Sequence, residues 1–586
     1  MPLCALNSAS FDFILPELYV EPTVSAVKHQ HMWSLNDFVT ELNVTKSIAL
    51  IGLPGTGKTT ILANLFLESK SASQFRFYFT AKDLVSVYTK RTSLNSIFKK
   101  LYNLDVVSYI NEHDSNVFFI DGLDEIRNED IDHLFEILQV FKNNNISFWI
   151  STRTDFYYRH MITDSKKMAL FYDVLLLEEW SIEQSMEFVK NFSKKASKNF
   201  IFTRVKELLD NGANIEGFLR NPFKVSLLIF LLSDESYGID RITANDFVLY
   251  REFYHQWLTQ EKNRGTSLNE AIDILSFHTE IATSLYTNRE SNELTNIISP
   301  EVLKKYNLMN DSAFIGLLQY KERLTQVLVE KFYHETLMEF LVGYGIIRSF
   351  LSGDNIVKYL DSVYNYGVNY FVRSAFENLG TKDKKIILNN LNNAYFSILK
   401  EQKDNEYWQK IREQIIYYVG RIPFEQYPEI LKYAYYNESN TILNRAAALS
   451  LILFGDEDIE HDYLGKLVIG SPHDLENRSI QLVYFGDVQA DLHKYRDDGI
   501  VMWERTKNAI IDRLSKTTRR DLNLRMWDIV TLYSFCVNRG TNILSDDDKI
   551  VIQDMIIEHI SISTKRRERL IEEKKKLLQY IEKGSL

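Results

Sequence analysis

The residues of this chain with the clearest chemical potential form a glycine-rich stretch that follows four apolar residues, Ile48–Ile51. The pattern G-x-x-x-x-G-K-[ST], typical of a phosphate-binding loop (P-loop), is matched by Gly52, Gly57, Lys58 and Thr59. Glycines let the backbone wrap around a phosphate and point its N–H groups inward. Lys58 would bring a positive charge to the terminal phosphates, and the Thr59 hydroxyl can ligate Mg²⁺.

The whole loop is expected to surround the phosphates. Its candidate binding residues are Gly52, Leu53, Pro54, Gly55, Thr56, Gly57, Lys58, Thr59 and Thr60. The amphipathic helix that follows would direct its positive N-terminal end at the same anion. A chance match in a flexible loop is the alternative, but the strand before and the helix after favour a nucleotide site. We therefore predict that the chain binds a nucleoside triphosphate, with the choice between ATP and GTP left open.

Acidic residues follow a second apolar stretch, Val117–Ile120. An acidic side chain directly after such a strand is where a P-loop enzyme holds Mg²⁺ through its water shell, which makes Asp121 the predicted metal residue. Asp124 and Glu125 are candidates for polarising the attacking water. Alone, the motif would be read as a polar turn that caps the next helix. Its position about sixty residues after the P-loop favours the catalytic role.

Another apolar stretch ends at Ile150 and is followed by Ser151, Thr152 and Arg153. A guanidinium at the end of this strand can reach a γ-phosphate and report its presence, so Arg153 is the third predicted catalytic residue. The alternative is a surface arginine that pairs with Asp155.

A parallel α/β sheet would bring these residues together. Between Ser47 and about Leu177, apolar segments alternate with helical ones, as parallel sheets require. The predicted strands are Ile48–Ile51, Phe75–Phe79, Val117–Ile120, Phe148–Ser151 and Val174–Leu177. Ligands of such sheets bind beyond the carboxyl ends of the strands, where the predicted site residues fall.

The composition sets limits on function. With 586 residues, 45% of them hydrophobic and 25% charged, the chain resembles an ordinary globular protein of roughly three to five units. A net charge of -11 argues against general affinity for nucleic acid. Two cysteines, Cys4 and Cys536, offer no disulfide framework and no metal cluster, which fits a reducing cytoplasm. We expect no secretory signal and no transmembrane helix.

Taken together, the motifs resemble the NACHT domain of the STAND class of P-loop NTPases. The matching segments are Gly52–Thr59, Phe118–Glu125 and Ile150–Thr154, and the doubled acidic tail of the second is the most specific feature. Leu175–Val189 is similar to the entry to the family's helical subdomain, and Leu249–Trp257 to the entry to its winged-helix subdomain. The resemblance covers about residues 19–345 and implies ATP/ADP and Mg²⁺ as cofactors.

Two further residues owe their assignment to this resemblance. Leu219–Phe223 resembles the family's proline motif, which implies that Pro222 packs on the adenine, although Arg220 stands where glycine is often found. Phe332–Leu341 resembles a motif whose histidine contacts the β-phosphate of ADP and locks the closed state, which implies that role for His334. It follows an alternating segment, residues 326–332, predicted as the wing strand. The alternative for His334 is a hydrogen-bonded core histidine.

The expected organisation is an α/β P-loop NTPase followed by helical domains. We predict a lead-in segment (1–46), a NACHT core with a parallel five-stranded sheet of the ASCE type (47–178), a helical subdomain (179–240), a winged-helix subdomain (241–348), an all-α, solenoid-like region (349–500) and a basic helical region (501–586).

Beyond residue 350 only periodicity is informative. Helical segments with an early arginine and a closing glycine recur as Arg373–Gly380, Arg412–Gly420, Arg445–Gly455 and Arg478–Gly486, which favours a helical repeat. Residues 501–586 carry a net charge of about +4, against about -15 for the rest. That basic end is either a nucleic-acid contact or a solvated charged helix.

The resemblance implies a switch rather than a metabolic enzyme. It would be a slow, Mg²⁺-dependent ATPase, closed with ADP and assembled into a homo-oligomer with ATP. Relatives of this kind imply a cytoplasmic bacterial sensor of a phage component, with no membrane partner. We expect no effector domain before the NTPase, so the output would lie in the C-terminal region or in a separate effector protein. A STAND-type transcription regulator and an ATPase subunit that remodels a partner remain open as alternatives.

Replacing the P-loop lysine tests the first of these expectations. Lys58→Ala should abolish nucleotide binding and function and leave the fold intact, because we expect an exposed loop with a solvated lysine. Isothermal titration with ATP and Mg²⁺ checks this, and an unchanged affinity would rule out the P-loop assignment.

Overall fold

The computed structural model describes most of residues 18–459. The described ranges are 18–27, 32–42, 46–68, 74–89, 93–103, 110, 115–161, 164–210, 215–238, 242, 245–263, 272–287, 296–298, 318–323, 326–332, 334–361, 364, 366–402, 405–424, 428–438, 441–454, 456 and 458–459. The chain divides into two compact units, Met1–Asn390 and Leu391–Leu586. Cys4, Cys536, the Arg478–Gly486 segment and residues 501–586 lie outside the described residues.

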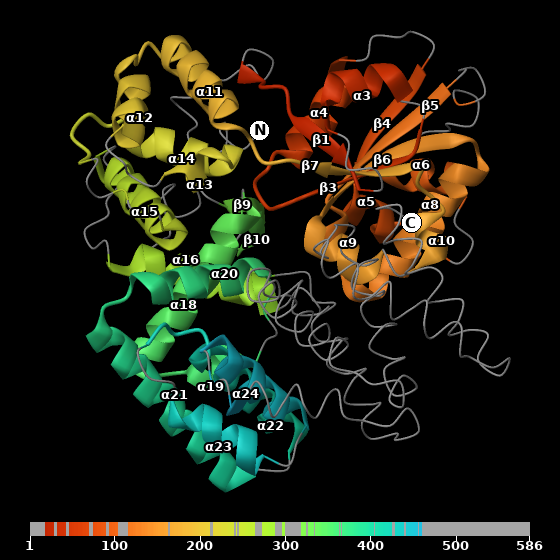
Figure 1. The fold of residues 1–586 in the computed structure, drawn as a ribbon. Coiled ribbons are helices and arrows are strands. Elements are labelled where there is room, and N and C mark those ends of the chain that lie inside the picture. Colours follow the sequence, from red (N-terminus) through yellow and green to blue (C-terminus); the bar gives the residue numbers. More distant parts are fainter. Residues whose placement is uncertain are drawn as a thin grey trace, which may run out of the picture. The chain divides into compact units, whose positions relative to one another are not determined.

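A mostly parallel sheet forms the centre of the first unit (Figure 1). Its described strands are β1 (Thr23–Ala26), β2 (Met32–Ser34), β3 (Ile48–Gly52), β4 (Gln74–Thr80), β5 (Ser115–Asp121), β6 (Ile146–Arg153) and β7 (Asp173–Leu177). They are ordered β2-β1-β7-β3-β6-β5-β4. The five strands predicted from the sequence are confirmed, and β3 to β7 pair in parallel.

The sheet also has two strands that the five-stranded expectation left out. β1 pairs antiparallel with β7, and β2 pairs antiparallel with β1. Val24 and Ala26 are fully buried because they cover the open edge of β7 and extend the core. The segment read as a lead-in therefore completes the sheet.

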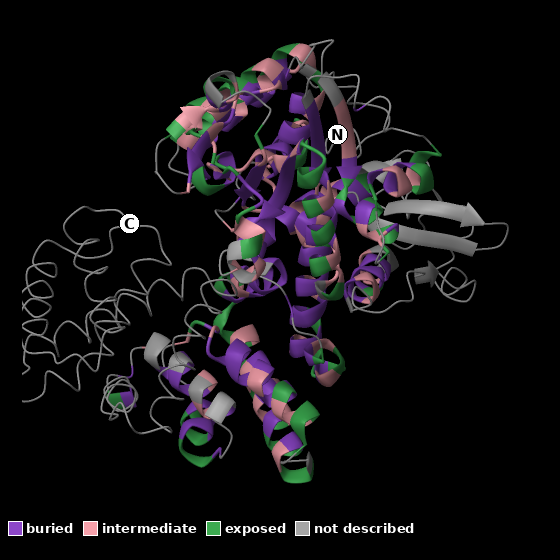
Figure 2. Ribbon diagram, turned by 90° about the vertical axis from the view of Figure 1, so that its right-hand side faces the viewer, coloured by how far each residue is buried: buried purple, intermediate pink, exposed green. Residues whose placement is uncertain are grey.

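The sheet has one hydrophobic core on each face because its strands are buried on both sides. In β3, Ile48 and Leu50 pack with α3 (Leu35–Leu42) and α4 (Lys58–Glu68). Ala49 and Ile51 face the other core. Figure 2 shows the strands of this sheet as mostly buried.

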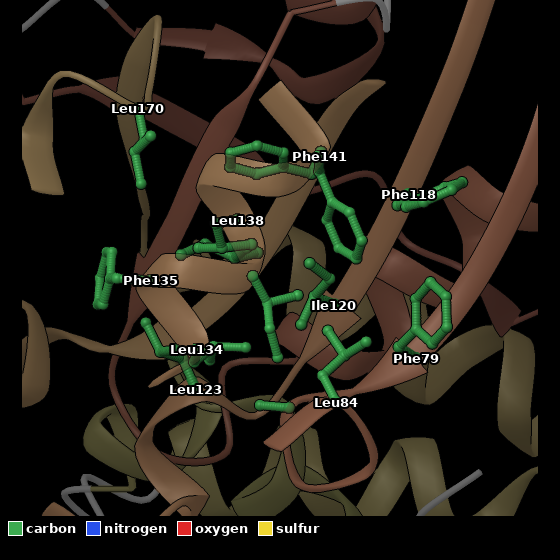
Figure 3. Packing of buried hydrophobic residues seen from close by; sticks show 14 of the residues in the cluster. Phe79, Leu84, Phe118, Ile120, Leu123, Leu134, Phe135, Leu138, Phe141 and Leu170 are labelled. Atoms are coloured by element: carbon green, nitrogen blue, oxygen red, sulfur yellow. The ribbon is translucent and has the colours of Figure 1, made fainter. Parts of the chain in front are cut away.

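The second face is covered by several helices. They are α5 (Ala81–Ser86), α6 (Leu94–Tyr102), α8 (Ile131–Asn143), α9 (Thr154–His160) and α10 (Ser165–Met168). Figure 3 shows how α8 contributes, with Leu134, Leu138 and Phe141 near Phe118 and Ile120 of β5. This packing holds the carboxyl ends of the strands in fixed positions.

A helical segment follows β7. It consists of α11 (Ile182–Lys195), α12 (Phe200–Asp210), α13 (Glu216–Leu219), α14 (Pro222–Leu232) and α15 (Asp246–Asn263). Almost every residue of α14 is buried, since its sequence is apolar on all sides and α11, α12, α13 and α15 pack around it.

The last part of the first unit contains a small antiparallel sheet and a buried helix. The sheet has the order β8-β10-β9, from β8 (Asn296–Ile298), β9 (Leu318–Arg323) and β10 (Gln326–Phe332), which confirms the strand predicted at 326–332. α18 (Glu335–Ser352) follows and packs on α16 (Ile272–Thr287) and α20 (Tyr366–Asn378). α19 (Ile356–Leu360) connects α18 to α20.

Helices continue into the second unit. They are α21 (Thr381–Gln402), which crosses the unit boundary, α22 (Glu406–Val419), α23 (Glu429–Asn437) and α24 (Thr441–Leu453). Arg412, one of the recurring arginines, is buried and pairs with Glu438 at 3.0 Å, so it has a packing role in this unit. A repeat over 349–500 remains a prediction. Among the helices that the structure describes, none is long and apolar enough to cross a membrane.

Candidate nucleotide site

The P-loop connects β3 to α4 in a tight turn. Gly55 and Gly57 have φ values of 78° and 97°, a backbone region that favours glycine. Lys58 Nζ donates hydrogen bonds to the carbonyl oxygens of Gly52 (3.0 Å) and Leu53 (2.8 Å). The hydroxyl of Thr56, which is buried, also donates to Leu53 O. The expectation of an exposed loop with a solvated lysine was therefore wrong, and Lys58→Ala would also remove bonds that hold the loop.

The start of α14 lies directly against the P-loop. Asn221 caps this helix, because its Oδ1 accepts from the backbone N–H groups of Phe223 and Lys224. Its Nδ2 donates to Pro54 O at 2.9 Å, across 167 residues of sequence. The N–H of Phe223 also donates to Gly55 O at 3.3 Å. A Cβ on Gly55 would come within 2.8 Å of Asn221 Oδ1, so glycine is needed for this approach.

Pro222 occupies the first turn of the same helix, a position that suits proline. Its contact with an adenine stays a prediction. The sequence analysis did not assign roles to Asn221 and Phe223. Asparagine before proline is a recognisable helix start, so the cap at Asn221 could have been found from the sequence.

Asp121 is the last residue of β5 and is held by its neighbours. Its Oδ1 accepts a hydrogen bond from Ser151 Oγ of the adjacent β6, and Ser151 Oγ in turn accepts from the N–H of Gly122. β6 lies between β3 and β5, so Asp121 and the P-loop lie at the same edge of the sheet. The carboxylate of Asp121 and the hydroxyl of Thr59 are the oxygen ligands that Mg²⁺ prefers. Within the described residues, no three His, Cys, Asp or Glu side chains form a group that could hold a metal ion.

The two acidic residues after Asp121 have different surroundings. Glu125, at the end of a 3₁₀ turn (Leu123–Glu125), is about one-third exposed and pairs with Lys82 Nζ at 3.2 Å. Asp124 is almost buried, and Arg153 contacts both of its carboxylate oxygens. The backbone N–H of Arg153 donates to Oδ1 at 3.0 Å, and its Nε lies 3.0 Å from Oδ2. This arrangement favours Glu125 over Asp124 as the group that polarises water.

Arg153, at the end of β6, is buried rather than at the surface, so the alternative of a surface arginine is wrong. Besides Asp124, its guanidinium contacts two carboxylates of α18. Its Nη2 lies 2.7 Å from Glu335 Oε2, and its Nη1 lies 2.6 Å from Glu339 Oε1. Neither glutamate had been singled out from the sequence, because Arg153 and Glu339 are 186 residues apart.

The pKa of Asp124 is raised to about 7. Burial is the main cause, and the negative charges of Glu335 and Glu125 add to it. The positive charges of Arg153 and Lys58 oppose the rise. The cluster therefore binds a proton more readily than an isolated aspartate does.

His334 caps α18 and is partly buried. Its Nδ1 accepts from the N–H of Thr336, and its ring stacks on Phe223 with ring centres 3.6 Å apart. Burial, with the charges of Arg153 and Lys58, lowers its pKa to about 3. The imidazole is therefore neutral, and the bond at Nδ1 assigns its proton to Nε2, which is a donor.

Comparison with known protein families gives a match for the sheet domain. Residues 48–168 match the model of the ATPase family associated with various cellular activities (AAA). The chain contains an AAA-type P-loop ATPase domain. Such a domain implies ATP hydrolysis, with ATP or ADP and Mg²⁺ as ligands. No curated protein matches the chain.

Several solved structures of AAA-type proteins are similar in part. Cdc6p from Pyrobaculum aerophilum is 14% identical over 52% of this chain and 90% of its own, with a TM-score of 0.25. The Orc1 protein of Aeropyrum pernix in complex with DNA is 13% identical over 60% and 98%, with a TM-score of 0.27. A Thermotoga maritima RuvB variant is 11% identical over 50% and 92%, with a TM-score of 0.23. At these values the likeness carries no functional argument.

The different surroundings of the acidic residues predict different effects of mutation. Asp121→Ala should weaken Mg²⁺-dependent nucleotide binding, because it removes the oxygen ligand at the end of β5. Glu125→Gln should bind ATP normally and hydrolyse it at least about tenfold more slowly. Equilibrium binding and single-turnover hydrolysis separate the two, and wild-type turnover in both variants would reduce the motif to a helix cap.

The pKa shifts predict opposite pH dependences for two variants. Because the pKa of His334 in the folded protein lies below the ordinary 6.5, folding loses stability as pH falls from 6.5 towards 3. The pKa of Asp124 is raised from 3.8, so folding gains stability from this group as pH falls from about 7 towards 4. Each contribution is at most about 1.4 kcal/mol per pH unit.

As the pH falls from 7.5 to 5.5, the stability of His334→Gln relative to the wild type should therefore rise. The stability of Asp124→Asn relative to the wild type should fall over the same range. Melting temperatures measured at several pH values in one buffer series check this. Parallel curves for all three proteins would show that neither group has a shifted pKa.

Proposed function

We propose that the chain is an ATP/ADP switch of the STAND type. In the closed state, ADP would lie between the P-loop and the segments that begin at Asn221 and His334. Exchange for ATP would release α18, rotate the winged-helix part outward and expose a surface for self-assembly. Hydrolysis would be slow, because a switch needs a long-lived ATP state.

The observation that supports this proposal most is the position of His334. Its ring stacks on Phe223, whose N–H donates to Gly55 of the P-loop. The positive charge of Lys58 contributes to the lowered pKa of His334, after burial and Arg153. A donor at Nε2 beside a phosphate-binding loop is suited to contact a bound phosphate. A segment so far along the chain would then respond to the nucleotide.

The biological setting follows from the NACHT resemblance of the motifs. We propose a bacterial defence protein that senses a phage component in the cytoplasm and assembles into a homo-oligomer when activated. Its output would come from the C-terminal region or from a separate effector protein. A nucleic-acid contact through residues 501–586 is a further part of this proposal.

Substitution of His334 separates a switch from a passive core contact. Loss of one hydrogen bond to a charged phosphate corresponds to about 1.5–3 kcal/mol. His334→Ala should therefore release ADP about ten- to a hundredfold faster and assemble without a trigger. Stopped-flow release of fluorescent ADP and light scattering at matched concentrations measure the two effects.

The exposed His255 of α15 offers a matched control, and His255→Ala should release ADP at the wild-type rate. An unchanged ADP release rate in His334→Ala, together with a lower melting temperature, would contradict the switch and indicate a core residue. The nucleotide in the purified wild type adds a second criterion. Tightly held ADP supports a switch, whereas an empty site would indicate an ATPase that cycles on a partner.

A further inference from the structure

Arg153 is shared between two parts of the fold that are distant in sequence. Its Nε contacts Asp124 of the ATPase domain, and its two terminal nitrogens contact Glu335 and Glu339 of α18. All three guanidinium nitrogens thus face carboxylates at 2.6–3.0 Å, and the side chain is only 9% exposed. In this arrangement the guanidinium faces α18 with both of its terminal nitrogens.

The same side chain lies at the phosphate edge of the sheet. In the pairing of β3 with β6, Arg153 stands opposite Gly52, the first glycine of the P-loop. The guanidinium fork binds phosphate and carboxylate oxygens with the same geometry. A terminal phosphate in the P-loop and the carboxylates of α18 are therefore alternative ligands for one guanidinium.

The position of Glu339 depends on a glycine in another helix. Glu339 is fully buried, and a buried carboxylate is stable only when paired. Gly367, in the first turn of α20, lies against the Glu339 carboxylate so closely that a Cβ at 367 would collide with it. Because Gly367 has no Cβ, the Glu339 carboxylate has the space it needs to reach Arg153.

We propose that Glu335 and Glu339 set the preference of this site for a nucleoside diphosphate over a triphosphate, by holding Arg153 in competition with the terminal phosphate. The inference rests on the proposed switch. ADP has no terminal phosphate to bind Arg153, so it coexists with docked α18. The terminal phosphate of ATP can bind Arg153 only in molecules in which Arg153 has left the carboxylates of α18. The apparent affinity for ATP is therefore the intrinsic affinity multiplied by the fraction of such molecules.

Variants of the contact make this quantitative. Glu339→Gln keeps the shape of the side chain and removes its charge. Gly367→Ala removes no charged group, but its Cβ displaces the Glu339 carboxylate sterically. Both should strengthen binding of the slowly hydrolysed analogue ATPγS by about ten- to a hundredfold, the range of one charge-assisted hydrogen bond, and change ADP binding by less than about threefold.

Gly380→Ala is the matched control. Gly380 follows α20, and a Cβ there would meet no atom within 4 Å. This variant should bind both nucleotides as the wild type does. Glu335→Gln, at the more exposed end of the cluster, should shift the ratio in the same direction as Glu339→Gln and remains informative if Gly367→Ala does not fold.

The measured quantity is the ratio of the dissociation constants for ADP and ATPγS with Mg²⁺, by titration calorimetry on the full chain. A purely structural role would lower the melting temperature and weaken both nucleotides equally, which would overturn the inference. An unchanged ratio in the two glutamate variants would overturn it as well. A wild type that binds ATPγS as tightly as ADP would contradict the proposed switch itself, which distinguishes the two failures.

Discussion

The burial of one arginine among three carboxylates is the constraint on which the site depends. A guanidinium and carboxylates removed from water are stable only in mutual contact, because each unpaired buried charge is costly. Arg153 therefore ties the carboxyl end of β6 to Asp124 of the acidic motif and to Glu335 and Glu339 of α18. Burial of the same cluster raises the pKa of Asp124, and the charges of Glu335 and Glu125 add to the rise. A phosphate that takes Arg153 would change all of these contacts together.

The P-loop has a comparable dependence on later parts of the chain. Asn221 holds Pro54 and Phe223 holds Gly55 by hydrogen bonds, while Phe223 stacks on His334. Three short contacts thus connect the loop, the start of α14 and the start of α18. The ends of helices have backbone groups that caps or ligands must satisfy. We therefore expect a bound nucleotide to act on the starts of α14 and α18.

The sequence was sufficient for the parts whose chemistry is local. The five parallel strands, the loop at Gly52–Thr59 and the position of Asp121 follow from hydrophobic patterns and spacing within short segments. It was not sufficient for contacts between distant segments. No residue near Glu339 in the sequence indicates that it pairs with an arginine 186 residues earlier. From the sequence alone, an acidic residue on an apolar helix is expected to face solvent, but Glu339 is buried. The antiparallel β1 was missed for a related reason, because four residues carry too little pattern to reveal the edge of β7 that they cover.

A double-mutant cycle between Arg153 and Glu339 tests the central claim most directly. The quantity to measure is the ratio of ADP to ATPγS dissociation constants in the wild type, Arg153→Ala, Glu339→Gln and the double variant. If the glutamate acts on nucleotide choice only by occupying the arginine, Glu339→Gln should shift the ratio about tenfold or more when Arg153 is present and less than about twofold when it is absent. An equal shift in both backgrounds would show that Glu339 acts through another route and would contradict the account.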